Sequence, residues 1–204
     1  MLHGYSDRIH HALAFTAKHH PGPVSRYDGH SCLIRASSVA VILARHGSDE
    51  ATITASILKQ LVDSCELDQL KRLHADIKRK FGETVAETVE SASEPRYDPL
   101  GRERTWKAAR FEYLARLQVA SARAVDVVAA DELHRLGAAL VSVRRLGVEY
   151  LEAAGVPQPD DTRWWLGSLL EMLRRHVLWR RTDILAELAR TADDLNGRLR
   201  ESGY

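Results

Sequence analysis

Several features that mark large protein classes are missing from this chain of 204 residues. It has two cysteines, Cys32 and Cys65, and no CxxC pair, which excludes a disulfide-rich secreted scaffold and a thiolate zinc site. No apolar run approaches the roughly 20 residues that a membrane-spanning helix needs, and the first residues lack the apolar segment of a signal peptide. We therefore expect a cytoplasmic protein without a membrane partner.

An excess of charge of one sign is also missing. The chain carries 29 Lys and Arg residues against 28 Asp and Glu residues, so its overall field does not attract nucleic acid, which we do not expect as a partner. Glycine-rich phosphate loops and the GxSxG and HExxH motifs are absent as well. The adjacent pairs His10-His11 and His19-His20 point in different directions on a helix, so we interpret them as surface and loop residues rather than metal ligands.

What the sequence does contain is helical periodicity over almost its whole length, with no alternation long enough for a sheet. We predict helices over 5–19, 36–46, 49–64, 67–80, 83–92, 105–120, 122–136, 137–153, 162–178 and 181–202, separated by loops at 20–29, 93–104 and 154–161. Ser48 or Asp49 is the expected cap of one helix, and Asp160 or Asp161 that of another. The pattern predicts one all-α domain over 1–204, in which 161–204 forms a helical pair that is a satellite or an interface element.

One predicted helix, at 49–64, combines an apolar stripe with polar residues that interrupt it. Ile53, Ile57 and Leu61 fall on one arc at 100° per residue. Lys59 and Asp63 fall opposite that arc, four residues apart, at the spacing of a surface ion pair, and Gln60 and Ser64 flank the stripe. Periodicity alone therefore predicts an exposed polar face.

Five segments in order along the chain give this face a second interpretation. They are "ALAFTAKHH" near the start, "RASSVAVIL" at 35–43, "SILKQLVDSC" at 56–65, "FGETVAETVESAS" at 81–93 and "VVAADELHRL" at 127–136. In order and rough spacing they resemble the hydrolase domain of RelA/SpoT homologues, especially the small alarmone hydrolases of the HD superfamily. The resemblance implies a single HD-domain-like helical bundle and a metal-dependent pyrophosphohydrolase ancestry.

The same resemblance implies a site, and this chain departs from it. Family members bind one divalent metal, typically manganese, through a His, a His-Asp doublet and a later Asp, and position the attacking water with a Glu-Asp pair. The corresponding residues here are Arg35, Lys59, Gln60 and Asp131 for the metal and Asp63 and Ser64 for the water. Arg and charged Lys have no lone pair to donate, so two cations beside Asp131 repel a metal rather than hold it.

Without a metal the pKa of water is not lowered, and no hydroxide nucleophile forms near neutral pH. We therefore expect no metal, no other cofactor and no catalytic residue, and a catalytically degenerate protein with a binding or regulatory role. Arg35 and Lys59 can form an ion-pair plug with Asp63 and Asp131, which we favour, or hold a phosphate-bearing nucleotide. A simpler alternative for Asp131 is a helix-surface pair with Arg135.

Two rival functions stay open at this point. An enzyme with relocated chemistry would draw on reactive side chains elsewhere, namely His30, Cys32, Cys65, His74 and His134. A structural subunit would pair with its own copy or with another protein through the C-terminal helices, which carry Trp164, Trp165 and Trp179. The basic segment "LRRHVLWRR" at 173–181 can touch an acidic partner, but we favour a solvated arginine face with Leu173, Val177 and Leu178 packed inward.

Overall fold

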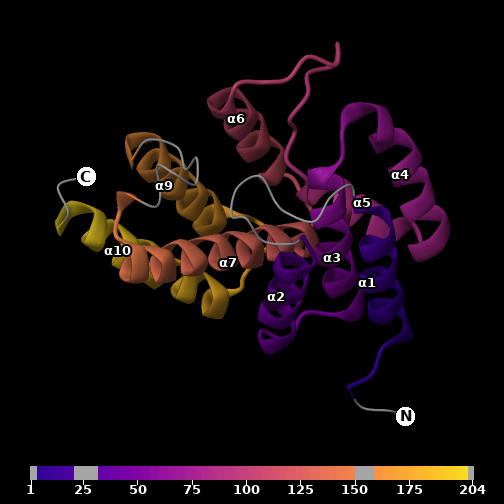
Figure 1. Ribbon diagram of the computed structural model, residues 1–204, viewed down its shortest axis with the longest axis horizontal. Coiled ribbons are helices and arrows are strands. Elements are labelled where there is room, and N and C mark those ends of the chain that lie inside the picture. Colours follow the sequence, from indigo (N-terminus) through magenta and orange to yellow (C-terminus); the bar gives the residue numbers. More distant parts are fainter. Residues whose placement is uncertain (1–3, 21–31, 150–158, 202–204) are drawn as a thin grey trace.

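The computed structural model describes residues 4–20, 32–149 and 159–201, and these are helical apart from their connections. The helices are α1 (Asp7–His19), α2 (Cys32–Arg45), α3 (Glu50–Ser64), α4 (Leu67–Phe81), α5 (Glu83–Ala92), α6 (Trp106–Leu117), α7 (Ala122–Leu146), α9 (Pro159–Arg175) and α10 (Thr182–Glu201) (Figure 1). The only strand-like pairing in the described ranges is an isolated bridge between Tyr97 and Glu103, inside the predicted loop at 93–104. The all-α prediction is confirmed.

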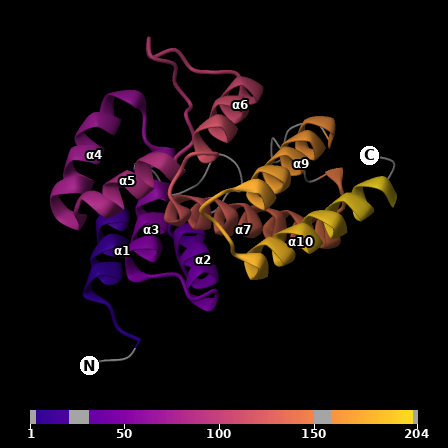
Figure 2. The same cartoon turned by 180° about the vertical axis from the view of Figure 1, so that it is seen from behind.

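Helix α7, with 25 residues, contacts helices from both ends of the chain. Helices α2, α3 and α5 pack on it at one end, and α10 lies along it at the other, with α9 between α10 and α6 (Figures 1 and 2). The buried apolar cluster is continuous from Ala12 to Leu199. The C-terminal pair α9 and α10 therefore shares its core with the rest of the chain.

The predicted break between helices at 122–136 and 137–153 is wrong, because α7 continues through Gly137. A helical Gly costs only about 1 kcal/mol relative to Ala, and the buried stripe of Leu136, Leu140 and Val143 continues past it. The helix ends at Gly147, whose φ of +83° suits Gly and whose backbone N–H bonds the carbonyl of Val143. Residues 150–158, which include most of the predicted third loop, lie outside the described residues.

Helix starts were predicted with mixed success. Asp49 caps α3 as expected, accepting a hydrogen bond of 2.8 Å from the backbone N–H of Thr52. Asp160 and Asp161 are not caps, because α9 already begins at Pro159 and both carboxylates lie in its first turn, where they favour the positive end of the helix dipole. Helix α2 begins four residues before the predicted 36, and the loop predicted at 20–29 lies almost wholly outside the described residues.

The three C-terminal tryptophans differ in where they lie. Trp165 and Trp179 are buried inside the chain, and the indole N–H of Trp179 donates to Asp126 at 2.7 Å. Trp164 is half-buried, with its ring 4.6 Å from that of Phe111. Two of the three are therefore not available to a partner, and any association through this pair of helices has to use other residues.

Candidate functional site

Helix α3 is enclosed by its neighbours, and this reverses the prediction made from its periodicity. Every residue from Thr52 to Val62 is buried, because α1, α2, α5 and α7 all pack against this one helix. Lys59 and Gln60 retain only 3% and 5% of their surface. Lys59 and Gln60 are thus interior and Asp63 is half-buried, so the expectation of an exposed polar face is wrong.

Asp131, on α7, is the residue that these buried polar side chains converge on. Its two carboxylate oxygens accept hydrogen bonds from the Arg35 guanidinium at 2.8 and 3.0 Å, a bidentate arrangement. Lys59 Nζ donates to the same carboxylate at 2.8 Å, and Gln60 Nε2 donates at 2.9 Å. Four donors from α2 and α3 therefore meet one carboxylate of α7.

Lys59 bridges two carboxylates. Its Nζ lies 2.8 Å from Asp131 Oδ2 and 2.5 Å from Asp63 Oδ2, one turn further along α3. Burial alone would lower the pKa of Lys59, but the charges of Asp131 and Asp63 outweigh it and raise that pKa well above its usual range. Burial would likewise raise the pKa of Asp131, yet the charges of Arg35 and Lys59 hold it far below normal. Both groups are ionised at neutral pH.

The central cluster, defined as Arg35, Lys59, Gln60, Asp63 and Asp131, balances its charges within the described residues. It contains two cations and two carboxylates, and Lys59 and Asp131 form its closed interior. The Arg35 and Asp63 side chains keep 23% and 27% of their surface, so the cluster reaches solvent through them.

Ser64 and Arg135 bond to groups outside the central cluster. Ser64, the sixth candidate, donates its hydroxyl to the carbonyl of Leu61 at 2.8 Å. The alternative pair between Asp131 and Arg135 is wrong, because the Arg135 guanidinium bonds Glu132 instead, with Nε 3.0 Å from Oε2. Asp131 and Glu132 are adjacent on α7 but face different helices. The i,i+4 spacing of Asp131 and Arg135 carries no information on these helices, so it does not predict which carboxylate Arg135 pairs with.

A second buried network adjoins the central cluster and was not predicted. Glu132 accepts a hydrogen bond of 3.0 Å from the indole of Trp165, and the guanidinium of Arg110 lies 4.3 Å from the Trp165 ring. Arg110 is also 3.3 Å from Glu94, whose pKa is raised by burial. The members come from α6, α7, α9 and the loop after α5, so no local sequence pattern links them.

The donor set does not fit a divalent metal. Both oxygens of Asp131 face N–H donors, and an ammonium group lies where a cation would approach that carboxylate. Across the residues that the structure describes, no three His, Cys, Asp or Glu side chains gather as metal ligands. The residues at the positions that the resemblance implies therefore do not fit a manganese ion.

Of the side chains considered for relocated chemistry, Cys32 and Cys65 are buried and close enough for their charges to interact. Burial raises the pKa of the Cys32 thiol to about 11 and also raises that of Cys65, so both are protonated and poor nucleophiles at neutral pH. His74 lies on α4 and His134 on α7, both half-buried. His30 lies outside the described residues.

Comparison with known proteins agrees with this helical arrangement. A family model described as HD domain matches residues 12–146, about two thirds of the chain. The chain belongs to the HD-domain family. Among curated proteins, none matches the sequence. No helix in the described ranges is long and apolar enough to cross a membrane.

Two solved structures share the fold of this HD-domain protein. The first is lmo0812 from Listeria monocytogenes EGD-e, with 18% identity and a TM-score of 0.64 over 80% of this chain and 99% of that one. The second is a metazoan ortholog of SpoT, described as hydrolysing ppGpp and having a role in starvation responses, with 17% identity and a TM-score of 0.69 over 98% and 97% of the two chains. At such identities the likeness establishes the fold alone.

Proposed function

We propose that this HD-domain protein is catalytically degenerate and acts as a binding or regulatory protein rather than as a metal-dependent alarmone hydrolase. The observation that carries the proposal is the position of Lys59 Nζ, 2.8 Å from Asp131 and 2.5 Å from Asp63. In the family that this chain resembles, a metal would supply the positive charge and lower the pKa of a bound water molecule. The ammonium of Lys59 supplies the charge, but it is not a Lewis acid and does not activate water in this way.

The same geometry favours a plug over a phosphate cradle. A nucleotide phosphate would have to compete with Asp131 for the Arg35 guanidinium, which is already held by two hydrogen bonds. It would also have to displace a buried carboxylate from Lys59, and stranding a buried charge is costly. Phosphate binding at this cluster is therefore the weaker of the two proposals.

The test is hydrolysis of guanosine tetraphosphate by the purified protein in excess manganese, with the metazoan SpoT ortholog as the active control. We expect no turnover and no stoichiometric metal by elemental analysis. Turnover that is lost in Asp131→Ala would contradict the proposal.

A triple variant, Arg35→His with Lys59→His and Gln60→Asp, restores the donor types that the resemblance implies. We expect it to bind manganese before it shows any turnover, because ligation and positioning of water are separate tasks. Metal binding by the parent protein equal to that of the triple variant would count against the plug.

A further inference from the structure

The turn between α9 and α10 exposes two large aliphatic side chains. Val177 and Leu178 keep 74% and 67% of their surface, whereas Leu173, one turn earlier on α9, is buried. The expectation that all three pack inward is therefore wrong for Val177 and Leu178. Two adjacent exposed aliphatic residues place apolar area in one spot, and a surface that covers them gains free energy by removing that area from water.

This turn is held rigidly by the residue that precedes it. His176 is buried, and its Nδ1 accepts hydrogen bonds from the backbone N–H groups of Leu178 and Trp179 at 3.3 and 3.1 Å. Its Nε2 lies 3.0 Å from the carbonyl of Leu117. The exposed pair thus sits on an ordered backbone, so little conformational entropy is lost when a partner covers it.

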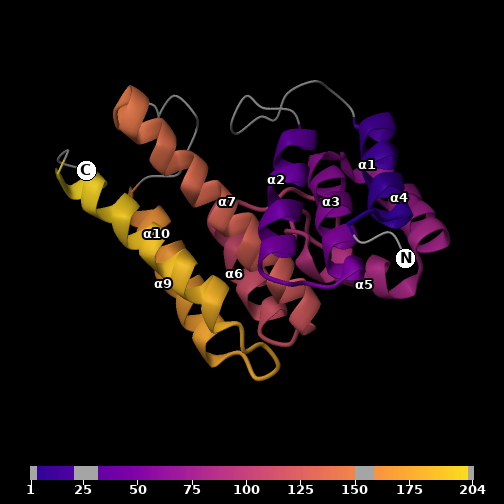
Figure 3. The same ribbon diagram turned by 90° about the horizontal axis from the view of Figure 1, so that it is seen from below.

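A second turn adds to the same surface. The bond from His176 ties the α9–α10 turn to the end of α6, and the α6–α7 turn that follows carries Val119, which keeps 84% of its surface. Figure 3 shows these two turns side by side at the lower edge of the molecule in that view. Together they bring exposed aliphatic side chains from two segments far apart in the sequence to one surface.

Arginines flank the surface formed by these two turns, and two of them have no carboxylate to balance them. Arg175 pairs with Glu171 at 2.6 Å and Arg181 with Asp126 at 3.1 Å. Arg180 donates to the backbone carbonyls of His176 and Trp179, and it is exposed, as is Arg174. Within the described part of the chain, no carboxylate lies at ion-pair distance from Arg174 or Arg180.

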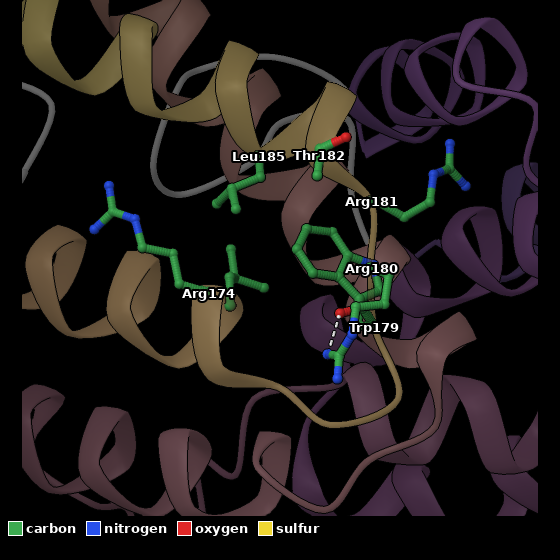
Figure 4. A pocket seen from close by; sticks show the side chains of 7 residues that line it. Arg174, Trp179, Arg180, Arg181, Thr182 and Leu185 are labelled. Carbon is green, nitrogen blue, oxygen red and sulfur yellow. Dashed lines mark hydrogen bonds between the residues drawn. The ribbon is translucent and has the colours of Figure 1, made fainter.

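The hollow beside the turn is not a built anion site. It lies between the end of α9 and the start of α10, and the side chains of Leu173, Trp179 and Leu185 form its apolar interior. Figure 4 shows the guanidinium groups of Arg174 and Arg181 pointing away from it. The positive charge is therefore displayed on the outer surface and not gathered around an enclosed ligand.

We propose that this tip, defined as Val119, Val177 and Leu178 with Arg174 and Arg180, docks on an anionic lipid surface. Exposed aliphatic side chains on two adjoining turns need no matching groove in a bilayer interface, where they enter the headgroup boundary. The arginines beside them that no carboxylate balances are attracted to the lipid phosphates. A second copy of the chain does not fit, since it would oppose like charges.

This inference goes beyond the proposed function and does not depend on it. The expectation of no membrane partner came from a net charge of +1 and from the lack of a spanning segment. A net charge averages over the whole molecule, whereas peripheral binding depends on the local surface that meets the lipid. The tip concentrates apolar area and unbalanced charge in one place.

The experiment is co-sedimentation of the full chain with vesicles of phosphatidylcholine mixed with phosphatidylglycerol, and with vesicles of phosphatidylcholine alone. We expect binding to the anionic vesicles only, decreasing as salt is added. Val177→Ser with Leu178→Ser should lower the partition coefficient about tenfold or more, and Arg174→Gln about fivefold. Melting curves of these variants should match that of the parent, because the changed residues are exposed.

Leu100→Ser is the matched control, since Leu100 is also an exposed loop leucine, at 76% of its surface, but its neighbour Arg102 is balanced by Asp98 at 2.7 Å. It should leave vesicle binding unchanged. Absence of binding to anionic vesicles, or an equal loss in the control, would overturn the proposal. Binding of soluble polyglutamate that depends on the tip residues, without vesicle binding, would replace the lipid by an acidic protein partner.

Discussion

Two regions of this molecule hold cationic side chains under opposite conditions. In the central cluster, the cations of Arg35 and Lys59 lie against two carboxylates and away from most solvent. At the tip, the exposed Arg174 and Arg180 have no carboxylate at ion-pair distance among the described residues. In the central cluster each charge is neutralised by a partner within the chain and stabilises the fold. At the tip the positive charge remains available to an outside partner.

Breaking the central cluster at its buried centre should have the largest effect. Lys59→Gln leaves Asp131 buried without its ammonium partner, and we expect it to lower the free energy of unfolding by roughly 3–5 kcal/mol. Chemical denaturation of parent and variant measures this difference.

The matched control is Lys107→Gln, which removes the lysine of an exposed pair with Asp161, 3.1 Å long. An exposed pair contributes at most about 1 kcal/mol. Equal losses in the two variants would mean that the environment of Lys59 is not as closed as its burial indicates.

A smaller loss should follow from Arg35→Gln, because its side chain keeps 23% of its surface and water can replace part of what is lost. We expect about 2 kcal/mol, the scale of hydrogen bonds to a charged group. If Arg35 is part of a plug, guanosine and adenosine nucleotides should leave the melting temperature of the parent unchanged. A nucleotide-dependent rise that Arg35→Gln abolishes would instead favour a phosphate cradle.

The pH dependence of stability offers a test of the same cluster. The folded pKa of Asp131 is depressed, so its contribution is complete above the unfolded value of about 4 and is lost as pH falls towards the folded pKa. The folded pKa of Lys59 is raised, so its contribution is complete below about 10 and is lost as pH rises towards the folded pKa.

The difference in unfolding free energy between parent and Lys59→Gln should therefore be flat from about pH 5 to 9 and shrink on both sides. Denaturation at several pH values gives this profile. A change centred near neutral pH would point to a group other than these two.

The features of this structure that the sequence predicts are those that depend on residues close together in the chain. Helical periodicity gave the all-α class and most helices, and Asp49 was recognisable as a cap from its place before an apolar run. The burial of Lys59 was not predictable in this way, because periodicity describes one helix by itself and carries no information on the helices that pack around α3. The resemblance supplied what periodicity could not, by relating α3 to Arg35 and Asp131.

The errors have the same origin. Which residues of a turn are buried depends on which of them find hydrogen-bond partners in the core. In the α9–α10 turn these are His176 and Trp179, which bond to Leu117 and Asp126. Those partners lie more than 50 positions earlier in the chain, on α6 and α7. A prediction from apolar character alone therefore places Val177 and Leu178 in the core, although they are exposed.

The smallest effect on stability should come from the tip. Arg174→Gln removes a charge that no carboxylate balances in the described structure, so no buried partner is stranded and the change in unfolding free energy should stay within about 0.5 kcal/mol. Val177→Ser and Leu178→Ser should be equally neutral, since both side chains already meet solvent in the folded state and removing them opens no cavity. Chemical denaturation of a tip variant that combines Arg174→Gln, Val177→Ser and Leu178→Ser, measured beside Lys59→Gln, completes the contrast between the two regions. A loss above about 2 kcal/mol in this tip variant would show that the tip packs against the chain itself, and would remove the reason to look for a surface that covers it.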